Sequence, residues 1–148
     1  MPQFRFSVPG EPKGKARART FFDPRVNRMV SKTPDNTVLY ENLVKMCYQS
    51  TSHGYRFPDD TPLQITVRAF FSIPKRTPKK RITLLLANQI RPTKKPDIDN
   101  ITKAVLDALN GVAYKDDAAI VQFSVEKYYS YCPRVDVIIG ELEAPQNG

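Results

Sequence analysis

Two pairs of aspartates stand close together in the sequence and could hold a metal ion. Asp97 and Asp99 flank one isoleucine directly after Pro96, and Asp116 and Asp117 are adjacent. The chain carries a formal net charge of +8, so its own cations could neutralise these carboxylates unless another ligand needs their oxygens. Mg²⁺ and Mn²⁺ favour hard carboxylate oxygens and need no histidine or cysteine. The pairs therefore predict a site for one or two divalent cations.

The residues between the two pairs have the pattern of an amphipathic helix. At about 100° per residue, one stripe is apolar and comprises Ile98, Ile101, Ala104, Val105, Ala108 and Leu109. The opposite face is polar and comprises Asp99, Asn100, Lys103 and Asp107. Gly111 predicts the C-terminal end of this helix. One face should pack on the core, and the other should meet water or a substrate.

A metal at these carboxylates would polarise a phosphodiester, while surrounding lysines and arginines neutralise the rest of a nucleic-acid backbone. Lys103 would contact the scissile phosphate or stabilise the leaving oxyanion, a charge that develops in the transition state. Its replacement should therefore lower turnover more than binding.

The same residues also have structural interpretations. Asp97 could be a helix N-cap. The spacing of Asp99, Lys103 and Asp107 also suits surface ion pairs of about 0.3–0.5 kcal/mol each. Asp116 and Asp117 could form a turn before the next strand.

Composition excludes several other kinds of chemistry. The two cysteines, Cys47 and Cys132, form no CxxC pair, and His53 is the single histidine. A zinc site, a disulfide framework or a histidine-based triad is therefore difficult to build. The excess of 23 Lys and Arg over 15 Asp and Glu suits a nucleic-acid partner, although it could also serve solubility alone.

Other periodic segments predict the elements that position these residues. Two-residue alternation predicts strands over residues 4–8 and 62–74, and two further strands over 118–129 and 134–143 that pair as a hairpin. A helix is predicted from Asp35 to about Ser50, with a packing face that comprises Val38, Leu39, Leu43, Met46 and Cys47. The expected fold is α/β (α+β), a small mixed sheet packed by two main helices in a single domain spanning residues 1–148.

No apolar stretch approaches the roughly 20 residues that a membrane span needs. The N-terminus, MPQFRFSVPG, has no apolar segment typical of an export signal. We therefore expect a cytoplasmic protein without a membrane partner.

Two segments concentrate positive charge. Residues 9–20 read as an exposed loop with Lys13, Lys15, Arg17 and Arg19, and Lys75 to Lys95 contains eight cations and no acid. Within the second segment, a short helical stretch over residues 83–90 would make its apolar contact through Leu84, Leu85, Leu86 and Ile90. This segment could contact DNA or remain a disordered, solvated loop.

The stretch KPDIDNITKAVLDALNGVAYKDDAAIV, residues 95–121, resembles the signature of the RusA family of Holliday-junction resolvases. Its parts are D-x-D-N, a lysine, L-D-A-L and a D-D pair before a strand. A weaker match to G-x-P-x-x-x-x-R-x-R comprises Gly10, Pro12, Arg17 and Arg19. With it, the resemblance covers most of the chain.

The resemblance implies a RusA-like homodimer that nicks two opposed strands of a four-way DNA junction with Mg²⁺, for which Mn²⁺ can substitute. It makes Asp97, Asp99 and Asp117 the metal-binding acids and Lys103 the catalytic lysine. Asp116 is a further candidate, since one member of the adjacent pair is enough to face the metal.

DNA contacts are expected from the basic segments, at Lys13, Lys15, Arg17, Arg19, Lys94 and Lys95. The length of the segment from Lys75 to Lys95 departs from the shortest members of the family, so it could also extend the substrate range to flaps and forks. Two other functions fit the same residues. One is a branched-DNA or RNA binding module with structural acids, and the other is a less selective nuclease.

Overall fold

The computed structural model describes residues 2–32 and 34–143 of the 148-residue chain. The elements follow the order β1 (Gln3–Pro9), β2 (Arg19–Asp23), β3 (Arg28–Lys32), α1 (Asp35–Ser52), β4 (Leu63–Ser72), α2 (Lys79–Leu86), α3 (Ile98–Leu109), the 3₁₀ turn η1 (Asp117–Ala119), β5 (Ile120–Ser130) and β6 (Arg134–Glu141). The α+β class predicted from the sequence is confirmed. No helix in the described ranges is both long and apolar enough to cross a membrane.

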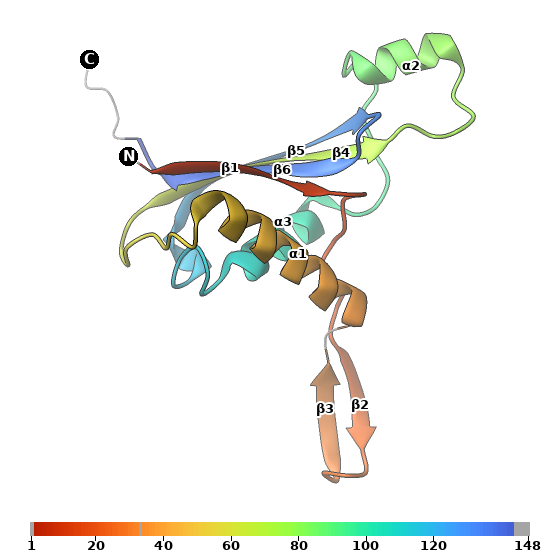
Figure 1. The fold of residues 1–148 in the computed structure, drawn as a ribbon. Coiled ribbons are helices and arrows are strands. Elements are labelled where there is room, and N and C mark those ends of the chain that lie inside the picture. Colours follow the sequence, from red (N-terminus) through yellow and green to blue (C-terminus); the bar gives the residue numbers. More distant parts are fainter. Residues whose placement is uncertain (1, 33, 144–148) are drawn as a thin grey trace.

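The main sheet has four strands in the order β1-β6-β4-β5 (Figure 1). β6 is antiparallel to both β1 and β4, whereas β5 is parallel to β4, so the sheet is mixed as predicted. The predicted hairpin of the last two strands is wrong, because β4 lies between β5 and β6. The connection over residues 131–133 has to span only about 10 Å, twice the spacing of neighbouring strands.

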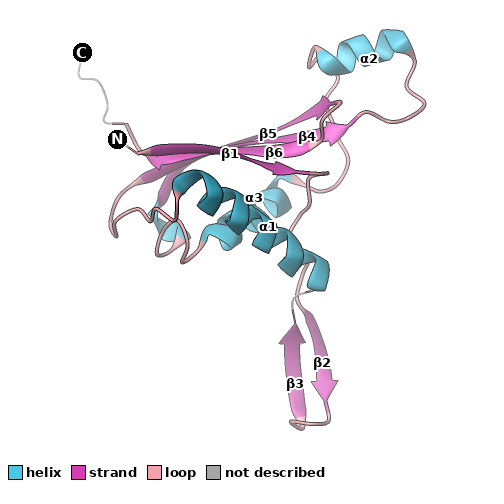
Figure 2. Cartoon of the chain, viewed as in Figure 1, coloured by secondary structure: helices cyan, strands magenta, loops and turns pink. Residues whose placement is uncertain are grey.

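Helices α1 and α3 cover one face of this sheet, and α2 lies beyond one end of it (Figure 2). β4 supplies the centre of the core with five inward-facing residues, Leu63, Ile65, Val67, Ala69 and Phe71. α3 buries the predicted stripe except Ile98, which is 44% exposed at the first turn. The apolar face of β4, which recurs every second residue, thus packs against the apolar stripe of α3, which recurs about every 3.6 residues.

The predicted packing face of α1 is wrong for Val38, Leu39 and Met46, while Leu43 and Cys47 are half-buried against the core as predicted. The buried positions are Thr37, Tyr40, Val44, Tyr48 and Ser52, whereas Leu39 and Met46 are 68% and 65% exposed. The tyrosines decide the orientation: the Tyr48 ring packs edge-on against Phe4 and Phe6, and its hydroxyl donates a hydrogen bond to the Tyr55 carbonyl. An aromatic ring buries more apolar area than the aliphatic side chains of the competing stripe.

Residues 19–32 form an antiparallel hairpin, β2–β3, which no apolar alternation in the sequence predicted. It extends away from the helices and the main sheet (Figure 1). The segment from Lys75 to Lys95 contains α2, of which Leu85 alone is fully buried among the four predicted apolar contacts.

Candidate functional site

Asp97 and Asp99 lie at the N-terminal end of α3. Asp97 occupies the N-cap position, but its side chain makes no capping hydrogen bond, and Asp99 lies in the first turn. Both residues are exposed. The N-cap interpretation therefore accounts for the backbone position of Asp97 and not for its carboxylate, which caps no amide of the described residues.

Lys103 lies on the same exposed face of α3, one turn beyond Asp99. Within the described part of the chain, no salt bridge joins Lys103 to Asp99 or to Asp107. Asp107 pairs instead with Lys15, 3.2 Å from Nζ to Oδ2. The surface ion pairs that would give the spacing of Asp99, Lys103 and Asp107 a structural role are therefore not formed. The exposed Lys103 ammonium is accessible to an anionic ligand such as a phosphate.

The basic loop that follows β1 packs along α3. The Lys15 amide donates a hydrogen bond of 3.0 Å to the Asn100 carbonyl, and a Cβ atom at Gly14 would lie 2.9 Å from those of Pro96 and Asn100. The Lys15 ammonium lies 2.6 Å from Glu41 Oε1 of α1. Burial lowers the pKa of this ammonium, but its hydrogen bonds to Glu41 and Asp107 outweigh that effect and leave the pKa raised. Lys15 thus fastens the loop to both helices.

A second acidic group lies beyond the C-terminal end of α3. The Asp117 amide donates a hydrogen bond of 3.0 Å to Asn110 Oδ1, which fixes the start of η1 against the end of the helix. Burial raises the pKa of the Asp117 carboxyl, and a hydrogen bond with Asp116 and the charges of Asp116 and Asp107 raise it further. Asp107 and Asp116 therefore both lie close enough to Asp117 to repel its charge.

Tyr114 is buried among these three acids. Its hydroxyl donates a hydrogen bond of 2.8 Å to the Leu106 carbonyl, and the residue is 1% exposed. Desolvation raises its pKa, and the charges of Asp117, Asp107 and Asp116 add to this effect. Tyr114 is thus a packing residue that supports the acidic group, and its ring is not available to stack on a base.

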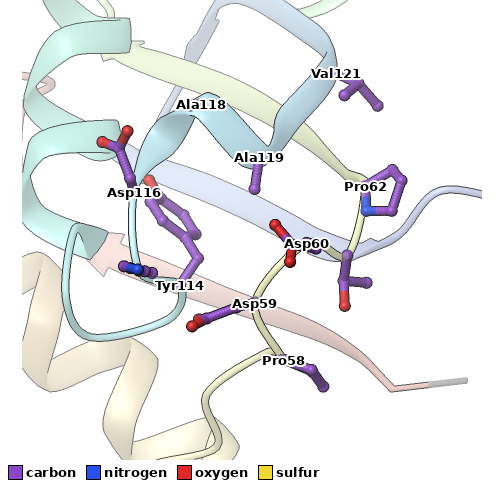
Figure 3. Close-up of a pocket in the computed structure, with 11 residues that line it drawn as sticks. Pro58, Asp59, Asp60, Pro62, Tyr114, Asp116, Ala118, Ala119 and Val121 are labelled. Carbon is purple, nitrogen blue, oxygen red and sulfur yellow. The ribbon is translucent and has the colours of Figure 1, made fainter.

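A hollow of about 410 Å³ adjoins this group (Figure 3). Its lining includes Asp59 and Asp60 from the loop before β4, together with Tyr114 and Asp116. The hollow therefore shares Asp116 with the predicted metal site, while Asp97, Asp99 and Asp117 lie outside its lining.

The predicted metal-binding acids thus lie in two places. Asp97 and Asp107, ten residues apart on one helix, are separated by roughly 15 Å along its axis. Among residues 2–32 and 34–143, no three histidine, cysteine or acidic side chains are placed to hold a metal ion. The metal site over Asp97, Asp99, Asp116 and Asp117 stays a prediction.

The predicted DNA-binding cations have different environments. Lys13, Arg17, Arg19, Lys94 and Lys95 are exposed. Lys15 is occupied by its two carboxylate partners, so the structure gives it a role in holding the loop.

The end of the long basic segment is held on β5. Arg91 donates a hydrogen bond of 2.8 Å to the Lys127 carbonyl, and its guanidinium lies 4.2 Å from the centre of the Tyr128 ring. Lys127 Nζ in turn donates to the Lys94 carbonyl. The alternative of a disordered loop is therefore wrong for this segment, which contains the helix α2 and a stretch after it that is hydrogen-bonded to β5.

Three residues of this region were not predicted as site residues. Lys127 lies near Asp97: burial lowers the pKa of its ammonium and the charge of Lys94 lowers it further, while Asp97 opposes both. Lys127 belongs to β5, 30 residues after Asp97 in the sequence, and no local pattern links these two residues. Asp107 pairs with Lys15, and Asn110 accepts a hydrogen bond from the Asp117 amide. The four-residue spacing of Asp107 from Lys103 was the sequence signal that could have indicated Asp107.

Comparison with known proteins identifies the family. The family model for Endodeoxyribonuclease RusA matches residues 9–140. The chain is also 33% identical over 146 residues to YqaN from Bacillus subtilis (strain 168), a protein described as uncharacterized; the match covers 97% of this chain and 100% of that protein. This chain belongs to the RusA endodeoxyribonuclease family. The family model covers the chain from the last residue of β1 to the penultimate residue of β6, including both ends of α3.

Proposed function

We propose that this protein is a Mg²⁺-dependent, homodimeric endodeoxyribonuclease that resolves four-way DNA junctions by paired, symmetric nicks. The main support is the polar face of α3, where Asp99 and Lys103 are exposed and unpaired with each other in a chain of net charge +8. A surface that only bound DNA would gain nothing from carboxylates that repel phosphates.

The donor set fits Mg²⁺ in its chemistry, since all the candidate ligands are carboxylate oxygens. Mg²⁺ commonly binds one or two protein carboxylates and takes its other ligands from water and substrate phosphates, so a cage of three acids is not required. Asp97 and Asp99 at the start of α3 would hold one ion, and Asp117 beyond its end, with Asp116 as a further ligand, would hold a second. When bound, a metal ion would polarise the phosphodiester and lower the pKa of a coordinated water.

The remaining functions fall to the side chains of this chain. Lys103 would stabilise the oxyanion that leaves the scissile phosphate. Lys13, Arg17, Arg19, Lys94 and Lys95 would neutralise phosphates along the junction arms and orient them on the protein. Asn110 would hold Asp117 in place through the hydrogen bond to its amide.

A dimer supplies the second active site that a two-fold symmetric junction requires. The unburied stripe of α1 suits the contact between copies: Leu39 and Met46 are exposed seven residues apart, and the half-buried Leu43 lies between them. Spacings of four and three residues are typical of helix pairs that pack in register. We propose that α1 packs against α1 of the second copy.

A synthetic four-way junction tests the nuclease proposal, with magnesium compared against a chelator. We expect symmetric nicks with magnesium, none with the chelator, and no nicks by Asp99→Asn, which should still bind the junction. Asp35→Asn is the matched control, since Asp35 is an exposed aspartate in the first turn of α1, outside the acidic residues of α3 and the adjoining hollow. Cleavage by Asp99→Asn at the wild-type rate would refute the assignment.

Substrate comparison separates the alternatives. Equal cleavage of junction, linear duplex and single strand would indicate a less selective nuclease. Junction binding without nicks in any divalent metal would indicate a binding module.

A further inference from the structure

The β2–β3 hairpin is an arm without a partner in the described structure. Its two strands pair only with each other, and it extends from the body next to the start of α1 (Figure 1). A two-stranded hairpin alone is marginally stable in water at best. The arm therefore has a shape that suits contact with another molecule.

Both faces of the arm present apolar side chains. Phe22 lies opposite Met29 on one face, and these residues are 54% and 60% exposed. Phe21 lies opposite Val30 on the other face and is 41% exposed. Since neither face packs on the core, an occupant could contact an aromatic ring from either side.

The charge of the arm indicates the kind of occupant. Residues 19–32 contain four cations, Arg19, Arg25, Arg28 and Lys32, and one acid, Asp23. Asp23 forms an ion pair with Arg25, with 3.1 Å between Arg25 Nη2 and Asp23 Oδ2. Arg19 and Lys32 lie directly opposite each other across the strands, so like charges are adjacent. The same arm of a second copy would be repelled, whereas a polyanion would be attracted.

Exposed aromatic rings flanked by cations are the chemistry that binds unpaired nucleic-acid bases: the rings stack on bases and the cations neutralise phosphates. We infer that the β2–β3 arm binds the branch point of the DNA substrate and stacks Phe22 on a base that is unstacked there. This inference rests on the proposed function for its substrate, and it assigns recognition of the branch to a surface separate from the acidic residues of α3.

The test is binding in the presence of a chelator, which separates the arm from cleavage. We expect Phe22→Ala to weaken binding to a four-way junction by about 5- to 150-fold, the equivalent of the roughly 1–3 kcal/mol of stacking one base. Its affinity for linear duplex of the same length should be unchanged. Tyr131→Ala is the matched control, since Tyr131 is an aromatic residue that is 70% exposed in the turn after β5. Phe22→Trp should retain junction binding, and Phe22→Leu should not.

A 2-aminopurine base at the branch point reports the stacking directly. Wild-type protein should change its fluorescence, and Phe22→Ala should not. Equal loss of affinity for junction and duplex, or no loss for either, would overturn the inference. A monomeric Phe22→Ala protein beside a dimeric wild type would assign the arm to contact between copies and overturn it as well. Absence of any DNA binding by the wild type would instead refute the proposed function, on which the arm's role depends.

Discussion

Lys15 allows the strongest quantitative prediction, because the sequence and the structure give it different roles. The sequence places it among the DNA-binding cations of an exposed loop. In the structure its ammonium lies 2.6 Å from Glu41 Oε1 and 3.2 Å from Asp107 Oδ2. Lys15→Met retains most of the aliphatic chain and removes both ion pairs, so it separates the two roles.

The magnitude follows from the exposure of each pair. The Lys15 and Glu41 side chains are 25% and 16% exposed, so their contact lies between a buried charged hydrogen bond, about 1.5–3 kcal/mol, and a surface ion pair, about 0.2–1 kcal/mol. Asp107 is 38% exposed and its contact is longer, so it adds an amount typical of the surface pair. We expect Lys15→Met to lower the free energy of unfolding by about 2 kcal/mol.

Urea denaturation followed by circular dichroism measures this loss. With a slope of about 2 kcal/mol per molar urea, the midpoint should fall by about 1 M at an unchanged slope. Lys13→Met is the matched control: Lys13 is exposed in the same loop, so its replacement should change stability by less than about 0.5 kcal/mol. The same control should lower DNA affinity and reduce its salt dependence, which Lys15→Met should leave unchanged.

The pH dependence adds a second measurement. The pKa of Lys15 is raised above its ordinary value of 10.5 in the folded protein, mainly because hydrogen bonds to Glu41 and Asp107 outweigh burial. Its contribution to stability is therefore complete below the unfolded pKa and is lost as the pH rises through the folded pKa. The stability difference between wild type and Lys15→Met should be constant near neutral pH and shrink above about pH 10.5. Equal stability of the two lysine variants would refute the structural role.

Three further changes have defined outcomes. Gly14→Ala should destabilise the fold by about 1–3 kcal/mol in urea denaturation, because its Cβ would lie 2.9 Å from Pro96 and Asn100. Tyr114→Phe removes one of the two donors to the Leu106 carbonyl, which keeps the Asn110 amide, and should lower the unfolding free energy by about 1 kcal/mol in the same assay. Lys103→Gln should reduce single-turnover cleavage of the junction by at least about 100-fold, the scale of one lost transition-state donor, and change binding by less than about 10-fold.

The elements that the sequence predicts best are those with one strong apolar period. α3 has a single apolar stripe, and its polar face carries no competing hydrophobic residue, so both its packing and the exposure of Lys103 follow from the spacing. α1 has two stripes. The predicted one, which includes Leu39 and Met46, has five apolar residues, whereas the buried one has three, and tertiary contacts of Tyr48 that no local pattern contains decide which stripe is buried.

Non-local pairing explains the other errors. The strand patterns of residues 118–129 and 134–143 are correct to within a few residues, but local periodicity cannot show that β4 enters between them. The β2–β3 hairpin buries little, so it has no alternation of buried and exposed residues to be recognised. Likewise, nothing in the loop sequence pairs Lys15 with Glu41, 26 residues away.

The distribution of ion pairs carries the functional interpretation further than the sequence does. Several acids of the described chain have a cationic partner within salt-bridge distance, namely Asp23, Asp35, Glu41, Asp107, Glu126 and Asp136. Among the described residues the four predicted metal-binding aspartates have none, although cations outnumber acids in the chain; the same is true of Glu11, Asp59, Asp60, Glu141 and Glu143. On the polar face of α3, Lys15 pairs with Asp107, the one acid of that helix that the resemblance does not assign to the metal. Unpaired carboxylates keep their oxygens for another ligand, so this distribution supports the proposed metal site, and the magnesium dependence of junction cleavage tests it.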